Sequence, residues 1–349
     1  MKKLILPVVA FTLFTLLHAC VSEELVTPDN TSTTTTTTVD QSNAKVGAAG
    51  ISGVNWADGR DNFVDGWVIP SGLTSNDSYN SASAKADAVV SGIIKNLSGV
   101  NTIRLPINPP SVAERWWGSY TGAIDKTLNK GMKVILACWE SSSSKDGRID
   151  NNTAFWKMWT TVIKKYGGNN NVYFEVFNEP HGYSLSQLTG IYAEFLSKFP
   201  NVPRGRILLS GTGYSENVTG VGADKRFSSC LLSLHNYAWW GKRSTAGWEK
   251  DWRSRMGNYK NRIVVTEFGA PMSTRKDYRN GPQSENEIAY IVGGSNVFRN
   301  DQVASVYWPG LRDDDSYSLL RRGGSGNNIT ISTVNASGVF RVRFGWGLL

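Results

Sequence analysis

Eight short apolar segments, each followed by a longer polar or amphipathic stretch, recur along the chain from about residue 50 onward. Within each segment the residues are continuously apolar, mostly Val, Ile and Leu, and do not alternate with polar ones. Such runs are typical of parallel strands that are covered on both faces. The predicted strands span residues 50–56, 102–106, 133–139, 172–177, 206–210, 231–237, 262–268 and 304–308.

Several of the stretches between these strands have the apolar spacing of helices. The predicted helices span residues 81–95, 120–129, 152–166, 184–199 and 285–298. Ser184 and Ser284 lie at or just before the start of the last two, where a serine can cap a helix.

Eight strand–helix units in a segment of roughly 300 residues predict an α/β fold, a (β/α)₈ TIM barrel, formed as one domain by residues 46–349. A doubly wound open sheet is the alternative. That fold usually has a glycine-rich phosphate loop after its first strand, and residues 50–61 lack this pattern. In a barrel, functional side chains are expected at the carboxyl ends of the strands.

The first 45 residues follow a different pattern. Met1-Lys2-Lys3 and the apolar run 4–17 predict a signal peptide of residues 1–19, because the run is shorter than the roughly 20 residues of a membrane-spanning helix. Leu17-His18-Ala19-Cys20 resembles the lipobox of bacterial lipoproteins, which implies lipidation of Cys20. Residues 20–45 are threonine-rich and too polar to form a core, and are expected to be a disordered tether.

These features predict a protein of the cell envelope, held at a membrane by its lipid anchor. The acidic segment 21–24 also resembles a tag that sends lipoproteins to the surface of the outer membrane. Ordinary secretion, with Cys20 incidental, is the alternative.

Composition excludes several other classes of protein. The formal net charge is +8, but the basic residues are scattered and form no run that would indicate nucleic-acid binding. No closely spaced His/Cys cluster predicts a metal site, and no residue set indicates a cofactor. Cys138 and Cys230 could form a disulfide in an oxidising compartment, although two free, buried thiols are favoured.

Two glutamates follow apolar strands at the same relative position. Residues 172–177 lead into Asn178-Glu179-Pro180, and residues 262–265 lead into Thr266-Glu267. The two glutamates are 88 positions apart, which corresponds to three strand–helix units and places them at the ends of strands 4 and 7. Cleavage of a glycosidic bond needs such a pair: one carboxyl group protonates the leaving oxygen, and the other attacks the anomeric carbon or activates water.

The motifs Phe177-Asn178-Glu179-Pro180 and Thr266-Glu267-Phe268-Gly269 resemble those of the clan A retaining glycosidases, and of glycoside hydrolase family 5, the cellulase-like family, in particular. The resemblance extends from about residue 50 to at least residue 308. It implies hydrolysis of β-glycosidic bonds in a polysaccharide or oligosaccharide through a covalent glycosyl-enzyme intermediate. Glu179 would be the general acid/base and Glu267 the nucleophile.

The same resemblance implies further substrate-binding residues. Arg104 would support the nucleophile and lower its pKa, and Asn178 would contact the sugar 2-hydroxyl. His235 would lie near the acid/base, Tyr237 near the nucleophile, and Trp308 would form the floor beneath the sugar.

At the end of strand 3 the chain departs from the family pattern. Trp139 stands where a histidine is common, with Glu140 beside it, so sugar recognition next to the leaving group is expected to differ. The segment from Trp239 to Trp252 is a further candidate for a sugar platform or a wall of the cleft.

Three questions stay open at this level. The glycan is not identified, because β-glucan, β-mannan and galactan all fit. A surface lipoprotein that binds glycans without cutting them is an alternative function, although such a protein has no use for the paired glutamates. A transglycosylase using the same intermediate is another alternative. We expect the protein to be a monomer.

Overall fold

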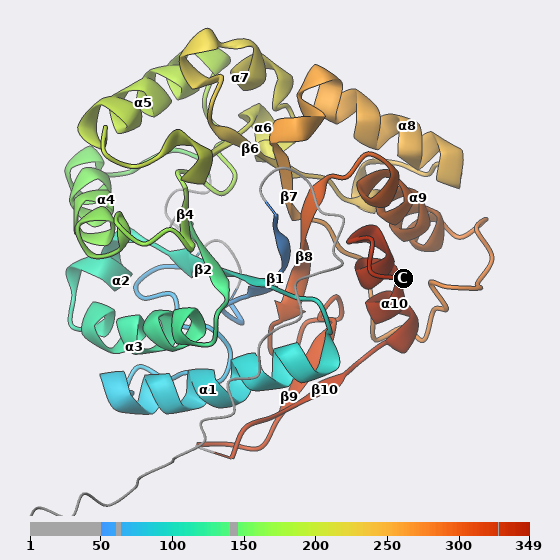
Figure 1. Ribbon diagram of the computed structural model, residues 1–349, viewed down its shortest axis with the longest axis horizontal. Helices are drawn as coiled ribbons and strands as arrows, with labels where there is room; N and C mark the ends of the chain where they lie inside the picture. The colour runs from blue at the N-terminus through green and yellow to red at the C-terminus, as the bar shows by residue number, and fades with distance from the viewer. Residues whose placement is uncertain (1–49, 61–63, 140–145, 327) are drawn as a thin grey trace, which may run out of the picture. The chain divides into compact units, whose positions relative to one another are not determined.

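The computed structural model describes residues 50–60, 64–139, 146–326 and 328–349, and within them the chain forms a barrel of parallel strands surrounded by helices (Figure 1). The barrel strands are β1 (Ser52–Trp56), β2 (Thr102–Ile107), β3 (Lys133–Cys138), β4 (Val172–Glu175), β5 (Ile207–Ser210), β6 (Leu231–His235), β7 (Ile263–Glu267) and β8 (Ala304–Leu311).

Each strand pairs in parallel with the next one along the chain, and β1 also pairs with β8, which closes the barrel. Val54 of β1 shows the closure, since it is paired with Ile103 of β2 on one side and with Tyr307 of β8 on the other. The predicted (β/α)₈ fold is therefore confirmed, and all eight predicted strands are present. Strand β4 ends two residues earlier than expected, and β8 continues three residues further, through a cis peptide bond between Trp308 and Pro309.

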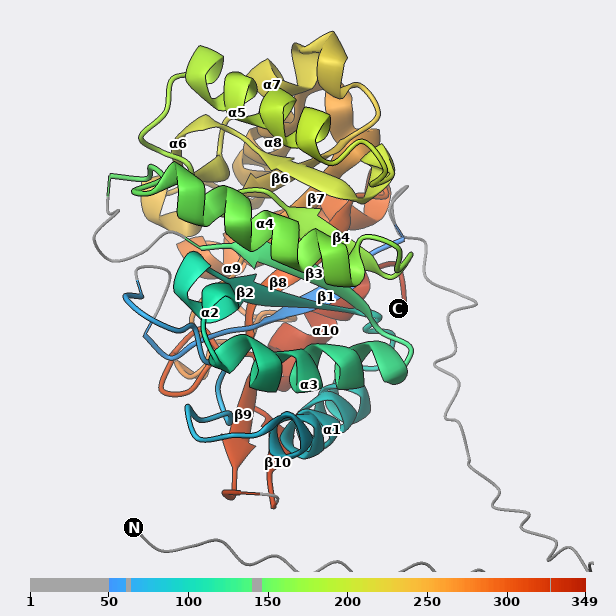
Figure 2. The same cartoon turned by 90° about the vertical axis from the view of Figure 1, so that its left-hand side faces the viewer.

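Longer helices pack around the outside of the barrel, as the side view shows (Figure 2). They are α1 (Tyr79–Asn96), α3 (Trp116–Asn129), α4 (Asn152–Tyr166), α5 (Leu185–Lys198), α8 (Thr245–Met256), α9 (Asn286–Asn300) and α10 (Ala336–Gly345). The five predicted helices are among them. The Ser184 side chain caps α5 as expected, whereas α9 begins after Glu285 and Ser284 does not cap it.

Two of these helices and a hairpin were not predicted. In α8 the buried side chains Trp248, Trp252 and Met256 recur every four residues among charged ones, so only a narrow stripe faces the barrel. The hairpin of β9 (Leu320–Gly323) and β10 (Thr330–Thr333) lies between β8 and α10. Shorter helices are α2 (Pro109–Ala113), α6 (Thr212–Ser215) and α7 (Thr219–Ala223).

Alternation along the strands decides which side chains enter the barrel. A small apolar cluster that includes Ile135, Tyr173, Leu231 and Val264 is formed by side chains of the six strands β3 to β8, together with Ile51 just before β1. Positions two residues further along these strands point the same way and lie closer to the carboxyl ends. Toward the carboxyl ends of the strands, the interior of the barrel thus changes from an apolar layer to a polar layer. The candidate site lies at the carboxyl ends, beyond the polar layer.

Several predicted features fall outside the described residues: the signal peptide, the lipidated Cys20, the tether up to residue 45, and Glu140. Cys138 and Cys230 are both buried and are not joined in a disulfide, as expected. None of the helices in the described ranges is both long and apolar enough to cross a membrane.

Candidate active site

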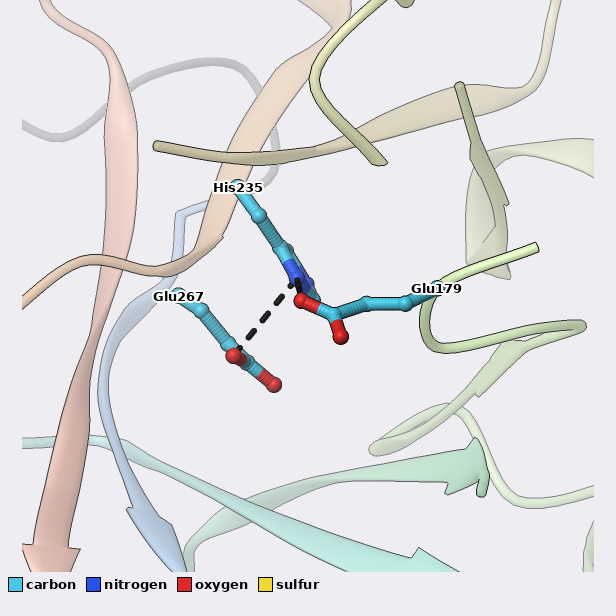
Figure 3. Close-up of side chains that lie close together, drawn as sticks. All are labelled: Glu179, His235 and Glu267. Carbon is cyan, nitrogen blue, oxygen red and sulfur yellow. Dashed lines mark hydrogen bonds and ion pairs between the residues drawn. The ribbon is translucent and has the colours of Figure 1, made fainter. Parts of the chain in front are cut away.

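Glu179 and Glu267 lie close together at the carboxyl ends of the strands, with the imidazole of His235 between them (Figure 3). Glu267 is the last residue of β7, and Glu179 follows β4 by four residues. One oxygen of each carboxyl group and one nitrogen of His235 all lie within 4.8 Å of one another. A register shift between β6 and β7 contributes to this arrangement, because it pairs His235 directly with Glu267.

Glu267 is almost fully buried and accepts hydrogen bonds on both oxygens. Arg104 Nη1 donates to Oε1 at 2.7 Å, and the Tyr237 hydroxyl donates to Oε2 at 2.9 Å. Arg104 Nη2 also donates to Asn178 Oδ1 at 2.5 Å, which fixes the orientation of that amide. The residues predicted around the nucleophile position are therefore brought together at the expected place.

Glu175 is a charged residue of the site that the sequence interpretation missed. Its carboxylate is fully buried and accepts two hydrogen bonds from Arg104, one from Nε at 2.6 Å and one from Nη2 at 2.9 Å. It lies two residues after Tyr173 and therefore also points into the barrel. Burial raises the pKa of Glu175, but the charges of Arg104 and His235 and their hydrogen bonds outweigh this effect and bring it to about 2. The sequence did contain a signal for this residue, because Glu175 is a lone acid inside an apolar strand. A carboxylate buried in that way needs a cation as its partner.

His235 contacts both glutamates through one nitrogen. Nδ1 lies 3.0 Å from Oε1 of Glu179 and 3.5 Å from Oε2 of Glu267, and Nε2 lies 3.0 Å from the hydroxyl of Thr266. Burial lowers the pKa of His235, but the charge of Glu267 and hydrogen bonds to Glu175 and Glu179 raise it to about 9. The imidazolium is thus a positive charge between two carboxyl groups at neutral pH.

The charge balance differs from expectation at Glu267. Burial raises the pKa of this carboxyl group, and the nearby charge of Glu179 acts in the same direction. The charges of His235 and Arg104 and the hydrogen bond from Tyr237 oppose the rise without reversing it. Arg104 therefore lowers the pKa of Glu267, as predicted, but its charge and that of His235 together do not offset the effect of complete burial.

Both glutamates open into a cavity of about 350 Å³. Trp308 lies in its wall and is nearly buried, consistent with a flat apolar floor. Aromatic side chains from the loops after β5, β6 and β8 make up much of the rest. The lining residues are Asn178, Glu179, Tyr214, Glu216, His235, Tyr237, Trp239, Trp240, Glu267, Trp308, Arg312, Asp315 and Tyr317.

Trp139 does not line this cavity. Its indole is buried against that of Trp308, with the ring centroids 5.7 Å apart, and it faces a separate cavity that Phe155 and Phe177 also line. A large apolar ring gains more from packing against Trp308 than from exposure to water. The Trp239–Trp252 segment divides in the same way: Trp239 and Trp240 are exposed at the cavity, whereas Trp252 is core.

The three convergent groups, Glu179, His235 and Glu267, also have the geometry of a potential metal site. An imidazole must lose its proton to bind a metal, and because the neighbouring carboxylates raise the pKa of His235, metal binding at this ring would compete with its protonation. Its Nδ1–H is turned toward a carboxylate. The donor set therefore fits acid–base chemistry better than metal binding.

Two carboxyl groups facing each other at the carboxyl end of a (β/α)₈ barrel, above an aromatic floor, define a glycoside hydrolase. The profile of the family Cellulase (glycosyl hydrolase family 5) matches residues 71–309. The chain belongs to this family.

Individual relatives are distant. Endoglucanase Z of Dickeya dadantii (strain 3937) is 26% identical over 210 residues, which cover 57% of this chain and 46% of that protein, so the match spans less than half of the relative. An endocellulase of Pyrococcus horikoshii in complex with cellotetraose has a similar fold, with a TM-score of 0.59 and 16% identity over 85% of this chain and 92% of that one. Cel5A (EG2) of Hypocrea jecorina also has a similar fold, with a TM-score of 0.57 and 14% identity over 84% of this chain and 97% of that one.

Proposed function

We propose that this protein is a retaining glycoside hydrolase that cleaves β-glycosidic bonds in a β-glucan, with Glu267 as nucleophile and Glu179 as general acid/base. The observation that carries the proposal is the short separation of the two carboxyl groups. One oxygen of Glu179 and one oxygen of Glu267 lie within 4.8 Å of each other. Retaining enzymes have carboxyl groups about 5–5.5 Å apart, whereas inverting enzymes need about 6.5–9.5 Å to admit a water molecule.

In the first step Glu267 attacks the anomeric carbon while Glu179 donates its proton to the glycosidic oxygen, so that the leaving sugar departs as an alcohol. A glycosyl ester of Glu267 is formed. The assignment follows from the contacts, since Glu267 is held on both oxygens by Arg104 and Tyr237 and cannot readily move. Glu179 is the more accessible of the two side chains, at 16% against 6% for Glu267, and can exchange protons.

In the second step Glu179, now ionised, takes a proton from water as the water oxygen attacks the anomeric carbon and releases Glu267. His235 supports both steps, because its positive charge lies beside whichever carboxyl group is ionised. Asn178 accepts from Arg104 through Oδ1, which leaves its NH₂ group as the donor for a sugar hydroxyl above the Trp308 ring.

The choice of a β-glucan is supported by relatives that are called endoglucanase and endocellulase. β-Mannan and galactan are included as substrates in the experiment below, because the polar groups at the cavity would also bind the hydroxyls of these sugars. Binding without cleavage, and transfer to a second sugar, are the competing functions.

The anomeric configuration of the first product decides the mechanism. Proton NMR of purified protein with cello-oligosaccharides, mannan and galactan is expected to show a β-configured product before mutarotation from at least one glucan. An α-configured first product would reject the retaining assignment. Absence of cleavage on every substrate, with retained binding, would instead support the non-catalytic function, and products longer than the substrate would indicate transglycosylation.

Two variants separate the roles of the glutamates. Glu179→Ala is expected to lose oligosaccharide hydrolysis but to form the covalent intermediate from a dinitrophenyl glycoside, whose leaving group departs as a stable phenolate and needs no proton. Glu267→Ala is expected to lose both reactions. Glu194→Ala serves as control, since this side chain is half exposed and pairs only with Lys198 among the described residues.

We further propose that the protein is exported and lipid-anchored through Cys20, on the strength of the sequence Leu17-His18-Ala19-Cys20. Labelling of cells with a radioactive fatty acid is expected to mark the wild type and not Cys20→Ala. Equal labelling of both proteins would reject the anchor.

A further inference from the structure

The end of the cavity beside Glu179 differs in charge from the end beside Glu267. The loop after β8 contributes Arg312 and Asp315, which form an ion pair of 3.0 Å, and the Arg312 guanidinium lies over the ring of Trp308. On the Glu179 side the loops after β5 and β6 contribute Tyr214, Glu216 and Trp240. Among the described residues that line this second end, none carries a positive side chain apart from His235 at the centre.

The aromatic residues of this end form a row. The Tyr214 ring stacks on His181, two residues after Glu179, with centroids 4.2 Å apart and planes at 20°. Trp240 continues the row, with its centroid 6.2 Å from Tyr214 and an angle of 28°. Both Tyr214 and Trp240 are exposed, and both line the cavity that contains the acid/base.

Glu216 is held in place by its surroundings. Its segment is anchored to the barrel, because the hydroxyl of Ser215 donates to the backbone oxygen of Ser233 in β6 at 2.9 Å. Arg255 of α8 approaches Glu216 at 3.5 Å but binds Asp251 more closely, at 2.9 Å. The guanidinium is therefore shared between two acids and does not line the cavity, so it compensates the charge of Glu216 only in part.

Glu216 is also close enough to Glu179 for the two carboxyl groups to repel each other. Burial raises the pKa of Glu216, the charge of Arg255 opposes this, and the charge of Glu179 adds to the rise. The two acids therefore contribute to one local field at this end of the cavity.

We propose that this end of the cavity binds the leaving-group sugar on Tyr214 and Trp240, and that Glu216 makes it selective for neutral or amino sugars and excludes uronic acids. The inference rests on the proposed function, because the acid/base must stand between the two sugars joined by the bond it cleaves. A sugar carboxylate at this position would lie beside Glu216 and Glu179, at an end whose described lining residues carry no positive side chain other than His235, and like charges brought together in a cleft are strongly disfavoured. An ammonium group would instead be attracted.

The test uses the second half of the reaction. At this stage a second sugar can enter the vacated leaving-group position and accept the glycosyl group in place of water. The glycosyl-enzyme is trapped with a dinitrophenyl 2-deoxy-2-fluoro-β-glucoside, and its reactivation is followed at about pH 6.5, where an alkyl amine is protonated. The acceptors are a phenyl β-glucoside, the matching glucosaminide and the matching glucuronide. We expect the glucuronide to reactivate wild type at least about tenfold more slowly than the glucoside, and the glucosaminide to be the fastest.

In Glu216→Gln the ratios between the three acceptors are expected to approach one. Trp240→Ala is expected to weaken all three acceptors while leaving their order unchanged. The control is Glu249→Gln, because Glu249 also lies 3.5 Å from an arginine, Arg253, but does not line the cavity. Its acceptor order is expected to match that of wild type.

Equal rates for the three acceptors in wild type would overturn the proposal, and this comparison needs no variant. An unchanged order in a folded Glu216→Gln protein would also overturn the role of Glu216. Failure of the proposed function has a different signature: no covalent adduct would form with the fluoroglucoside, as checked by mass spectrometry, and the inference would then fall with it.

Discussion

Arg104 binds Glu175 through two hydrogen bonds, from Nε at 2.6 Å and from Nη2 at 2.9 Å, and both side chains are completely buried. The same guanidinium also donates a hydrogen bond from Nη1 to Glu267. Glu175 therefore stabilises the buried cation on which the nucleophile depends, while its own negative charge weakens the pull of that cation on Glu267. It acts through Arg104 and is a positioning residue.

Replacement of Glu175 tests this arrangement. In Glu175→Gln the charge of Arg104 acts on Glu267 alone, so the pKa of Glu267 should fall and the acid limb of kcat/KM should move to lower pH. The free energy of unfolding should decrease by about 3 kcal/mol, because a buried ion pair loses one partner. Urea unfolding and a pH profile measure both effects.

The matched control for Glu175→Gln is Asp301→Asn, whose partner Arg253 is 43% exposed. An ion pair in contact with water is worth about 0–1 kcal/mol, so this variant should be close to wild type in both measurements. An acid limb that moves to higher pH in Glu175→Gln would contradict the proposed role.

The hydroxyl of Tyr237 donates to Glu267 and favours its ionised form. In Tyr237→Phe the pKa of Glu267 should rise further, and the acid limb of kcat/KM should shift to higher pH, opposite to the shift in Glu175→Gln. A decrease of kcat by about tenfold is expected for one lost hydrogen bond to a charged group. Tyr120→Phe is the control, because this buried hydroxyl donates only to the backbone oxygen of Pro106 in the described structure. Equal losses in both variants would indicate a general packing effect.

His235 links stability to pH. Its pKa is raised from 6.5 to about 9 in the folded protein, so it binds a proton more tightly when folded. This contribution is fully present below about pH 6.5 and is lost as the pH rises through 9. The free energy of unfolding of wild type should therefore decline between these values. His235→Asn should lack this part of the decline, as measured by urea unfolding at several pH values. Parallel pH curves for the two proteins would show that the His235 charge is not coupled to folding.

Trp139 supports the sugar floor from behind. Its replacement by alanine should cost about 3–5 kcal/mol of stability, because a large buried ring is lost. It should also raise KM, because the indole of Trp308 loses the neighbour against which it packs. Trp159→Ala is the matched control: Trp159 is equally buried, but it packs against Phe174 and Phe195 and does not line the cavity. The control should lose stability without a change in KM. A rise of KM in both variants would reject a specific role for Trp139.

The barrel was predictable because strands covered on both faces must be apolar along their whole length, and eight such runs stand out. The helix α8 was missed because its apolar stripe is a single row of three side chains, Trp248, Trp252 and Met256. The hairpin β9–β10 was missed because its residues are mostly polar and partly exposed, so its strands lack the apolar pattern that marks the barrel strands.

The positions of Glu179 and Glu267 were predictable for the same reason as the barrel. A carboxylate directly after a buried strand must lie at the strand end, and strands three units apart in a closed barrel bring such ends across from each other. Their neighbours Arg104, Asn178, His235, Tyr237 and Trp308 could be placed near them through the resemblance to a family. Their hydrogen-bond partners could not be placed in this way, because these depend on the stagger of the strands.

The sequence by itself thus determined the fold class and the two opposed glutamates, since both follow from local patterns repeated at regular spacing. Only the tertiary structure decided that Glu175 shares Arg104 with Glu267, that Trp139 packs behind Trp308, and that Glu216 faces the cavity beside Glu179. The physical reason is that burial and charge balance are properties of groups brought together from different strands and loops. A carboxylate two residues along a strand meets an arginine, a tryptophan or water according to the packing of the whole barrel.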